Sequence, residues 1–207
     1  MNGDLATRER LLEAAGRLFG DQGYKRVTVR EICRAAGANV AAVNYHFGDK
    51  LGLYREVLGG AIDAMRETTR AAQAAGEGRP SEEKLRLFIE IFLTRVLGSG
   101  SGAVHRLIKH EMNEPTPALD ALVDQALRPR IEYVSSVIAE IVGCAATDPR
   151  VLHCVGSVQS QALSYFPNPI AARLGFEFKG TPEEIARVAD HIATFSIAGI
   201  KGLAAKA

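Results

Sequence analysis

Side chains able to bind DNA are concentrated between residues 28 and 50. Asparagine pairs with adenine through two hydrogen bonds in the major groove, and alanine beside it lets a helix approach the base edges closely. Hydroxyl and basic groups at the start of a helix, where free amides favour an anion, suit the backbone phosphates. The pattern therefore predicts a DNA-binding surface made of Thr28, Arg30, Asn39, Ala41, Ala42, Asn44, Tyr45, His46 and Lys50.

Two short helices joined by a tight turn are needed to position these side chains. Thr28 followed by Glu31 has the capping-box spacing that begins a helix, and Gly37 supplies the tolerance of positive φ that the following turn needs. Asn39 caps the second helix, which is expected to run from residue 40 to about residue 46. These lengths predict a helix-turn-helix whose two helices pack through Ile32, Cys33, Ala36, Val40 and Val43.

Two of these side chains have an alternative role. His46 suits a phosphate contact, but it could instead cap its own helix or pack against the first helix of the chain. Tyr45 could lie partly in the core. The alternative for the whole region is a three-helix bundle whose polar residues are merely solvated.

The charge of this region is too small for one copy to bind DNA tightly. Residues 1–50 contain eight Lys or Arg and six Asp or Glu, a net charge of +2, whereas the whole chain has a net charge of +1. Helix-turn-helix proteins gain affinity by engaging two half-sites about one DNA turn apart, roughly 34 Å. The sequence therefore predicts a homodimer that spaces its two reading heads correctly on double-stranded operator DNA.

Helical periodicity and cap signals extend over the rest of the chain, and no segment has convincing strand periodicity. The predicted fold class is all-α, with a three-helix DNA-binding domain at residues 1–50 and a ligand-binding and dimerisation domain at residues 51–207. A helix that starts at about residue 50 connects them. About nine helices are expected, at residues 7–22, 28–37, 40–46, 50–75, 81–97, 103–113, 118–142 with a kink at Pro129, 148–166 and 181–204.

The composition is that of a globular protein without crosslinks. The 207 residues are 47% hydrophobic and 24% charged, so the chain can bury a core of its own. No apolar run approaches the ~20 residues of a membrane span, and the N-terminus lacks the apolar region of a signal peptide, which predicts a cytoplasmic protein with no membrane partner. Scattered Cys33, Cys144 and Cys154 predict buried thiols, with a redox pair of Cys144 and Cys154 as the alternative.

The last two predicted helices combine apolar and small residues at helical spacing. Small residues let two helices approach closely, which suits a four-helix bundle across a two-fold axis. These residues are Val151, Val155, Gly156, Ser160 and Ala162 in the first helix, and Ile185, Val188, Ala189, Ile192, Ala193, Ser196, Gly199, Ile200 and Leu203 in the second. We expect the two helices to form the homodimer interface; the alternative is that they form the core of a single chain.

A small-molecule pocket is expected among the helices between residues 50 and 166, because apolar residues there exceed what two packed layers need. Such pockets have apolar walls with a few polar groups, and the candidate lining residues are Phe88, Phe92, Leu107, Met112, Tyr133, Gln159 and Tyr165. His105, His110 and Glu111 are residue types that bind metals, but the two histidines are five residues apart and lack the i, i+4 spacing that places a pair on one helix face. No metal is therefore expected. GSGSG at 98–102 lacks the GK[ST] ending of a phosphate loop, so we expect a connector and no cofactor.

Three segments, TRERLLEAAGRLFGDQGY, VTVREICRAAG and NVAAVNYHFGDKLGLY, together resemble the tetracycline-repressor (TetR) family over about residues 5–58. The resemblance implies a dimeric one-component transcriptional regulator that a small molecule releases from its operator. It also implies base or groove contacts for Arg30, Ala41 and Asn44, and phosphate contacts for Thr28, Tyr45, His46 and Lys50. Many members read LYxYF or LYxHF where this chain reads VNYHF, a difference expected to change the preferred bases.

The segment HRLIKHEMNEPTPALDALVDQALRPRIEYV is similar to the branch of this family named for control of cefoperazone and chloramphenicol sensitivity. That similarity implies a repressor of transport, efflux or adjacent genes with an unidentified small-molecule effector. An activator is one alternative, and a small-molecule-binding enzyme on a helical scaffold is another. The chain has no nucleophile elbow, metal motif or nucleotide loop, so no catalytic residue is expected.

Overall fold

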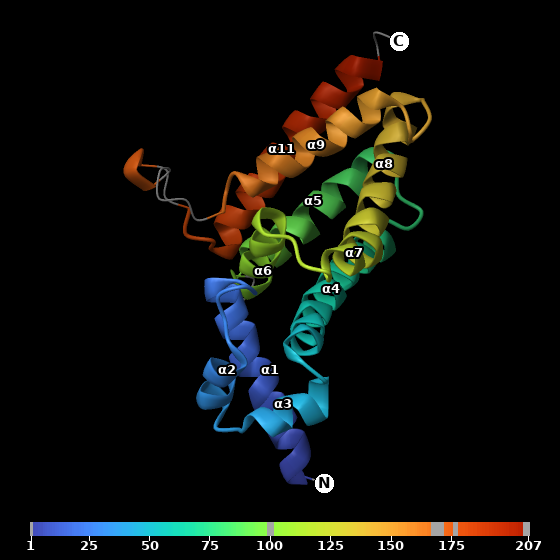
Figure 1. Ribbon diagram of the computed structural model, residues 1–207. Helices are drawn as coiled ribbons and strands as arrows, with labels where there is room; N and C mark the ends of the chain where they lie inside the picture. The colour runs from blue at the N-terminus through green and yellow to red at the C-terminus, as the bar shows by residue number, and fades with distance from the viewer. Residues whose placement is uncertain (1, 99–101, 167–171, 176–177, 205–207) are drawn as a thin grey trace. The chain divides into compact units, whose positions relative to one another are not determined.

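The computed structural model describes residues 2–98, 102–166, 172–175 and 178–204, and every regular element within these ranges is a helix. The elements are α1 (Asn2–Gln22), α2 (Val29–Ala36), α3 (Val40–Phe47), α4 (Lys50–Ala75), α5 (Ser81–Leu97), α6 (Gly102–Asn113), α7 (Leu119–Leu122), the π-helical turn η1 (Val123–Leu127), α8 (Arg128–Val142), α9 (Pro149–Leu163) and α11 (Pro182–Ala204) (Figure 1). The predicted all-α fold is confirmed. Over the same ranges, no single helix has both the length and the apolar character needed to cross a membrane.

The chain divides into two compact units. The first contains Met1–Ala64 and Gly102–Ala126, and in it α1 packs against α2, α3 and α6. The second contains Met65–Ser101 and Leu127–Ala207, where α5 packs against α8 and α11, and α9 packs against both of these helices (Figure 1). The first unit extends beyond residue 50 because it includes the start of α4 and all of α6 and α7. Assigning DNA binding to residues 1–50 and the other roles to residues 51–207 stays a prediction.

Helix α1 begins earlier than predicted. It starts at Asn2 and not at Thr7, which lies inside the helix and accepts a hydrogen bond from Arg10 at 3.2 Å. Leu5 and Ala6 before Thr7 are good helix formers, and Asp4 in the first turn interacts favourably with the helix dipole. A residue that is a good N-cap therefore does not by itself fix where this helix begins.

The segment predicted as one kinked helix at residues 118–142 consists of α7, η1 and α8, with Pro129 in the first turn of α8. A proline has no N–H for the carbonyl four residues earlier, here that of Gln125, and its ring crowds that carbonyl. A wider turn before the proline relieves both problems. This explains why the π-helical turn at Val123–Leu127 lies directly before the helix that contains Pro129.

The predicted helix starts near residues 148 and 181 are confirmed. Asp148 accepts a hydrogen bond from the Arg150 N–H at 2.8 Å at the start of α9, and bonds from Arg150 lower the pKa of Asp148 to about 2. Thr181 Oγ1 accepts from the N–H of Glu184 at 3.3 Å before α11. Both starts follow from residues no more than three positions apart, which is why local sequence was sufficient to predict them.

The core of the second unit contains most of the residues predicted for the dimer interface. Val151, Val155, Ala162, Ile185, Ala189, Ile192, Ala193, Ser196 and Ile200 are buried within the single chain. The alternative interpretation is therefore correct for these residues. Helical periodicity identified a buried face, but the packing partner of that face is the same chain.

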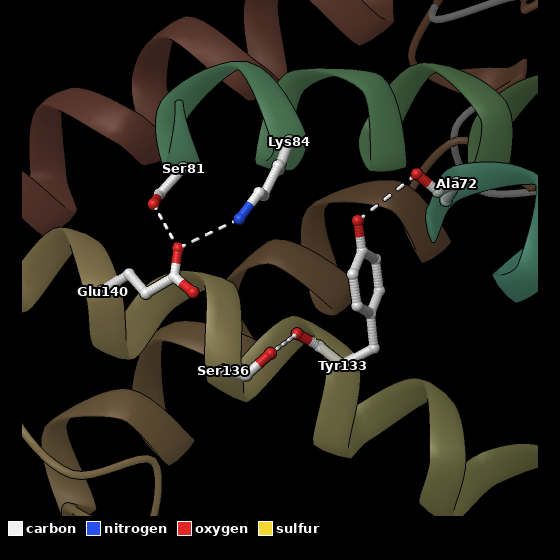
Figure 2. Close-up of polar contacts among 6 residues, drawn as sticks. All are labelled: Ala72, Ser81, Lys84, Tyr133, Ser136 and Glu140. Atoms are coloured by element: carbon white, nitrogen blue, oxygen red, sulfur yellow. Dashed lines mark hydrogen bonds and ion pairs between the residues drawn. The ribbon is translucent and has the colours of Figure 1, made fainter. Parts of the chain in front are cut away.

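Polar contacts tie α5 and the end of α4 to α8 within the second unit (Figure 2). Glu140 on α8 accepts hydrogen bonds from the Ser81 hydroxyl and, at 3.3 Å, from the Lys84 ammonium group, both in the first turn of α5. These bonds lower the pKa of Glu140. The Tyr133 hydroxyl donates to the carbonyl of Ala72 on α4 at 3.3 Å. Helix α8 is thus the common partner that holds both neighbours in place.

A buried hydrogen-bond network fixes α4 to α6 within the first unit. Glu111 is completely buried, and its carboxylate accepts hydrogen bonds from the Tyr54 hydroxyl at 2.6 Å, the Thr116 hydroxyl at 2.9 Å and the Thr116 N–H at 3.2 Å. Burial and the bond to Glu111 raise the pKa of Tyr54, so the phenol keeps its proton and remains a donor. The Tyr54 ring also packs edge-on against Phe19 of α1, with 5.0 Å between ring centroids.

The three cysteines are free thiols. Cys33 and Cys154 are buried, and burial raises the pKa of both. A raised pKa lowers the fraction of reactive thiolate at neutral pH. This favours the predicted packing role over a redox pair of Cys144 and Cys154.

Replacing Tyr54 with phenylalanine removes one donor from the buried Glu111 carboxylate. We expect the free energy of unfolding to fall by about 1–3 kcal/mol, because a buried acceptor loses a hydrogen bond that water does not replace. Urea-induced unfolding followed by circular dichroism measures this change. Tyr45→Phe is the matched control, since Tyr45 is exposed and has no hydrogen bond with the residues that the structure describes. An equal loss in both variants would contradict the structural role of the network.

Candidate DNA-binding surface and ligand cavity

The start of α2 is fixed by the predicted capping box. The Thr28 N–H donates to the Glu31 carboxylate at 2.8 Å, and the Glu31 N–H donates to the Thr28 hydroxyl oxygen at 3.3 Å. Hydrogen bonds from Thr28 lower the pKa of Glu31. The first-turn amides that remain for a phosphate are therefore those of Val29 and Arg30, while the Thr28 hydroxyl is engaged with Glu31.

Helix α3 presents most of the predicted base-reading side chains to solvent. Asn39 is the N-cap, and its side-chain oxygen accepts from the Ala42 N–H at 2.8 Å, which leaves its NH₂ group available. Val43 is fully buried on the inner face, whereas Ala41 and Asn44 are exposed and Ala42 is half-buried. The predicted orientation of the outward residues is present, and their contact with bases stays a prediction.

Val40 does not pack between the two helices as predicted. It is the first residue of α3, and 43% of its surface is exposed beside Ala41 and Asn44. Periodicity placed Val40 on the same side as Val43, but at the helix start its side chain lies beyond the packing contact. An exposed apolar group at this position suits the methyl group of thymine, so Val40 joins the candidate contact residues.

Tyr45 and His46 differ sharply in exposure. Tyr45 is 77% exposed, so the alternative that it lies in the core is wrong. Only 8% of the His46 side chain is exposed, and its Nε2 atom lies 3.3 Å from an Asp4 carboxylate oxygen on α1. The structure therefore supports the alternative role for His46, which is packing against the first helix. A phosphate contact is favoured for Tyr45 and not for His46.

Lys50 lies at the start of α4, held against an aromatic ring. Its Nζ atom is 4.3 Å from the centroid of Tyr24, and burial lowers its pKa. Asp49 caps the helix by accepting from the Gly52 N–H at 2.7 Å. A Cβ atom at Gly52 would lie 1.9 Å from the Phe47 carbonyl oxygen, so only glycine allows this tight connection between α3 and α4.

Two arginines of α1, Arg8 and Arg10, contact the ends of α2 and α3 and so hold the helix-turn-helix against α1. Arg10 Nε donates to the Ala36 carbonyl at the end of α2, at 3.1 Å. Arg8 pairs with Glu56 at 2.8 Å and lies over the ring of Phe47. By contrast, two arginines on the outer face of α2, Arg30 and Arg34, are exposed and form no ion pair with the residues that the structure describes, which leaves them available to phosphates.

A cavity lies in the second unit between α5, α8 and α9. Its lining consists of Phe88, Ile89, Phe92, Arg130, Ile131, Val134, Val155, Val158, Gln159 and Ala162. Three predicted pocket residues, Phe88, Phe92 and Gln159, are among them. The two phenylalanine rings stack with 5.7 Å between centroids. Arg130 was not predicted, because composition alone does not reveal whether an arginine has a partner.

The other four predicted pocket residues do not line this cavity. Tyr133 packs against Phe88 and donates its hydroxyl proton to the Ala72 carbonyl, and the Tyr165 ring packs against Phe178 instead. Leu107 and Met112 belong to α6 in the first unit, where Leu107 is buried and Met112 is 74% exposed. Apolar character selected all four, but apolar side chains are equally common in the ordinary core and on surfaces.

Comparison with known proteins agrees with this arrangement. Residues 11–57 match the family described as bacterial regulatory proteins of the tetR family. Residues 81–200, more than half of the chain, match the C-terminal domain of the HTH-type transcriptional dual regulator CecR. The chain therefore belongs to the TetR family of helix-turn-helix transcriptional regulators, whose members are regulators and not enzymes. Within that family, its C-terminal domain is of the CecR type.

Three proteins illustrate the similarity. The dual regulator CecR of Shigella flexneri is 27% identical over 70% of this chain and 69% of its own length. The transcriptional activator FasR of Mycolicibacterium smegmatis is 29% identical over 70% of this chain and 64% of its own length. A crystal structure of a TetR-family regulator from Mesorhizobium loti superposes with a TM-score of 0.65 at 19% identity, covering 95% of this chain and 97% of that chain, which shows the shared fold.

Asn44→Ala is expected to relax the preference for one base pair in each half-site by about 1–3 kcal/mol, because the paired hydrogen bonds to adenine are lost. Competition binding with single-base variants of the operator measures this preference. Asn113→Ala, at an exposed asparagine of α6, is the control. Unchanged base preference in Asn44→Ala would remove Asn44 from the residues that read sequence.

Proposed function

We propose that this protein is a homodimeric repressor that binds a palindromic operator and leaves it when a small molecule binds in the C-terminal domain. The observation that carries the proposal is the outer face of α3, where Ala41, Asn44 and Tyr45 are exposed above the fully buried Val43. This is the arrangement that a recognition helix needs in the major groove. Action on DNA in the cytoplasm follows from this role.

Control of transport, efflux or adjacent genes is the proposed output. Its support is the CecR-type C-terminal domain at residues 81–200. The sign of regulation has one alternative, because the relative FasR is named an activator and CecR a dual regulator. A reporter fused to the target promoter distinguishes them: deletion of the regulator raises expression if it represses and lowers expression if it activates.

Dimerisation is proposed through the exposed faces of α9 and α11, which pack side by side in the second unit (Figure 1). Residues three or four positions apart lie on one face of a helix. The exposed apolar and small residues with this spacing are Leu152, Gly156, Ser160 and Leu163 on α9, and Phe195, Gly199, Gly202 and Leu203 on α11. An apolar stripe of this kind on a helix pair suits a second copy related by two-fold symmetry.

The glycines of this stripe support close approach of a partner helix. Glycine inside a helix costs about 1 kcal/mol relative to alanine. A Cβ atom at Gly156, Gly199 or Gly202 would meet nothing within 4 Å among the residues that the structure describes, so packing against these residues does not require glycine there. Close contact with the helices of a second copy would account for all three.

Phe195→Asp is expected to convert the dimer to a monomer, because Phe195 is 65% exposed and would place a charge in the apolar centre of the proposed interface. Sedimentation equilibrium measures the mass, and operator binding should be lost together with the dimer. Ala186→Asp adds the same charge at an exposed position on the opposite side of α11 and should leave both unchanged. A dimeric Phe195→Asp variant would exclude this interface.

The DNA-binding proposal is tested by footprinting on DNA that flanks the gene of this protein, followed by binding to the protected duplex over a range of salt concentrations. Binding through phosphates weakens steeply as salt rises. The absence of a salt-sensitive complex with any flanking duplex would contradict the proposal. Release by a small molecule is then sought by screening for loss of the same complex.

Lys50→Ala is expected to weaken binding to all duplexes about equally and to reduce the slope of log K against log salt concentration by about one, because one phosphate contact is lost. Lys109→Ala, at an exposed lysine of α6, is the control and should leave the slope unchanged. A loss confined to particular base sequences would contradict a phosphate contact for Lys50.

A further inference from the structure

The cavity of the second unit contains an arginine that has no counter-ion among the residues that the structure describes. Arg130 is only 9% exposed, and its guanidinium carbon lies 5.1 Å from the centroid of the Phe92 ring. It forms no ion pair or hydrogen bond with the residues that the structure describes. Gln159, the other polar residue of the lining, likewise has no hydrogen bond to any of these residues.

A buried and unpaired cation lowers the stability of a fold. Replacing buried charges with apolar side chains of similar size is often neutral or stabilising, because the desolvation of the charge is avoided. The contact with Phe92 offsets only part of that cost. Burial lowers the pKa of Arg130 to about 10, which leaves the guanidinium charged at neutral pH. An anion bound in the cavity would offset the rest.

We propose that this cavity binds a carboxylate with an apolar body. The guanidinium of Arg130 forms two parallel hydrogen bonds to the carboxylate, a geometry that arginine favours. The Gln159 amide supplies a further polar contact, and the apolar part of the ligand lies between α5, α8 and α9 against the phenylalanine rings. This inference rests on the proposed function, since it names the chemical class of the effector.

Ligand binding must rearrange the walls of the cavity. Its volume is about 20 Å³, which is room for about one water molecule. The stacked rings of Phe88 and Phe92, only 11° from parallel, have to separate to admit an apolar chain. Because Phe92 also contacts Arg130, a ligand that pairs with Arg130 and displaces Phe92 changes the packing of α5 against α8.

The position of Arg130 in the chain gives such a change a route to the first unit. Arg130 lies in the first turn of α8, and the preceding η1 contains the boundary between the units, at Ala126 and Leu127. Single π-helical turns are frequent at functional sites in helices. A displacement of Arg130 would therefore act next to one of the three places where the chain passes from one unit to the other.

Isothermal titration calorimetry on the full-length protein tests the ligand class, with hexanoate, octanoate and decanoate as probes and the matching primary alcohols as uncharged controls. We expect a carboxylate to bind at least about tenfold more tightly than its alcohol, and Arg130→Met to remove this difference. Arg130→Met should also be as stable as the unmodified protein or more stable in urea unfolding, which excludes misfolding as the cause. Arg128→Met, an exposed arginine in the same turn, should bind carboxylates normally.

Three results would overturn the inference: equal binding of acids and alcohols, unchanged carboxylate binding by Arg130→Met, or no heat from any carboxylate at about 1 mM. Operator binding measured in parallel separates this inference from the proposed function. Carboxylate binding through Arg130 without release from the operator would uphold the binding site but overturn the assignment of carboxylates as the effector class. A protein that binds no duplex would refute the proposed function, whatever the calorimetry shows.

Discussion

The first unit depends on keeping the buried Glu111 carboxylate supplied with hydrogen-bond donors. The donors come from two segments, Tyr54 on α4 and Thr116 after α6, so a shift of α4 along α6 would remove the Tyr54 donor from the carboxylate. An unsatisfied buried acceptor is more costly than most surface contacts are favourable. Because α4 begins at Lys50, directly after α3, the same bonds fix the helix to which α3, the proposed recognition helix, is connected. The position of α3 is thus set by contacts that do not touch DNA.

The helix starts were predictable because a cap and its partner lie within three residues of each other. Thr28 with Glu31, and Asp148 before a proline, carry their structural meaning locally, and both are present. Asp49 also caps a helix, by accepting from the Gly52 N–H, but it lacks the glutamate three residues later that marks a capping box in the sequence. The π-helical turn before Pro129 could not be predicted, because proline signals a break without fixing which wider turn accommodates it.

The site was predicted less completely, since exposure and pairing depend on residues far apart in the sequence. The outward face of α3 followed from helical spacing, whereas Val40 and His46 were misplaced because their surroundings are set by the ends of other helices. Periodicity likewise identified the apolar side of α11 but not which partner covers it, and the exposed stripe containing Phe195 emerged only after the core was known. The sequence did not identify Arg130 as a ligand-binding candidate, because it does not show whether an arginine forms an ion pair in the folded chain.

The two units differ in how fully contacts within one chain satisfy their buried charged groups and cover their apolar side chains. In the first, the buried Glu111 carboxylate has all the donors it needs. In the described part of the second unit, Arg130 has no counter-ion, no neighbouring atom requires glycine at Gly156 or Gly199, and Phe195 is exposed. Natural sequences depart from local consistency mainly at functional sites, where a partner completes the interaction. A short recognition helix with a weakly charged head needs a second copy at a fixed spacing. The second unit, which contains these unsatisfied features, is therefore the unit to which we assign the proposed dimer interface and the proposed ligand site.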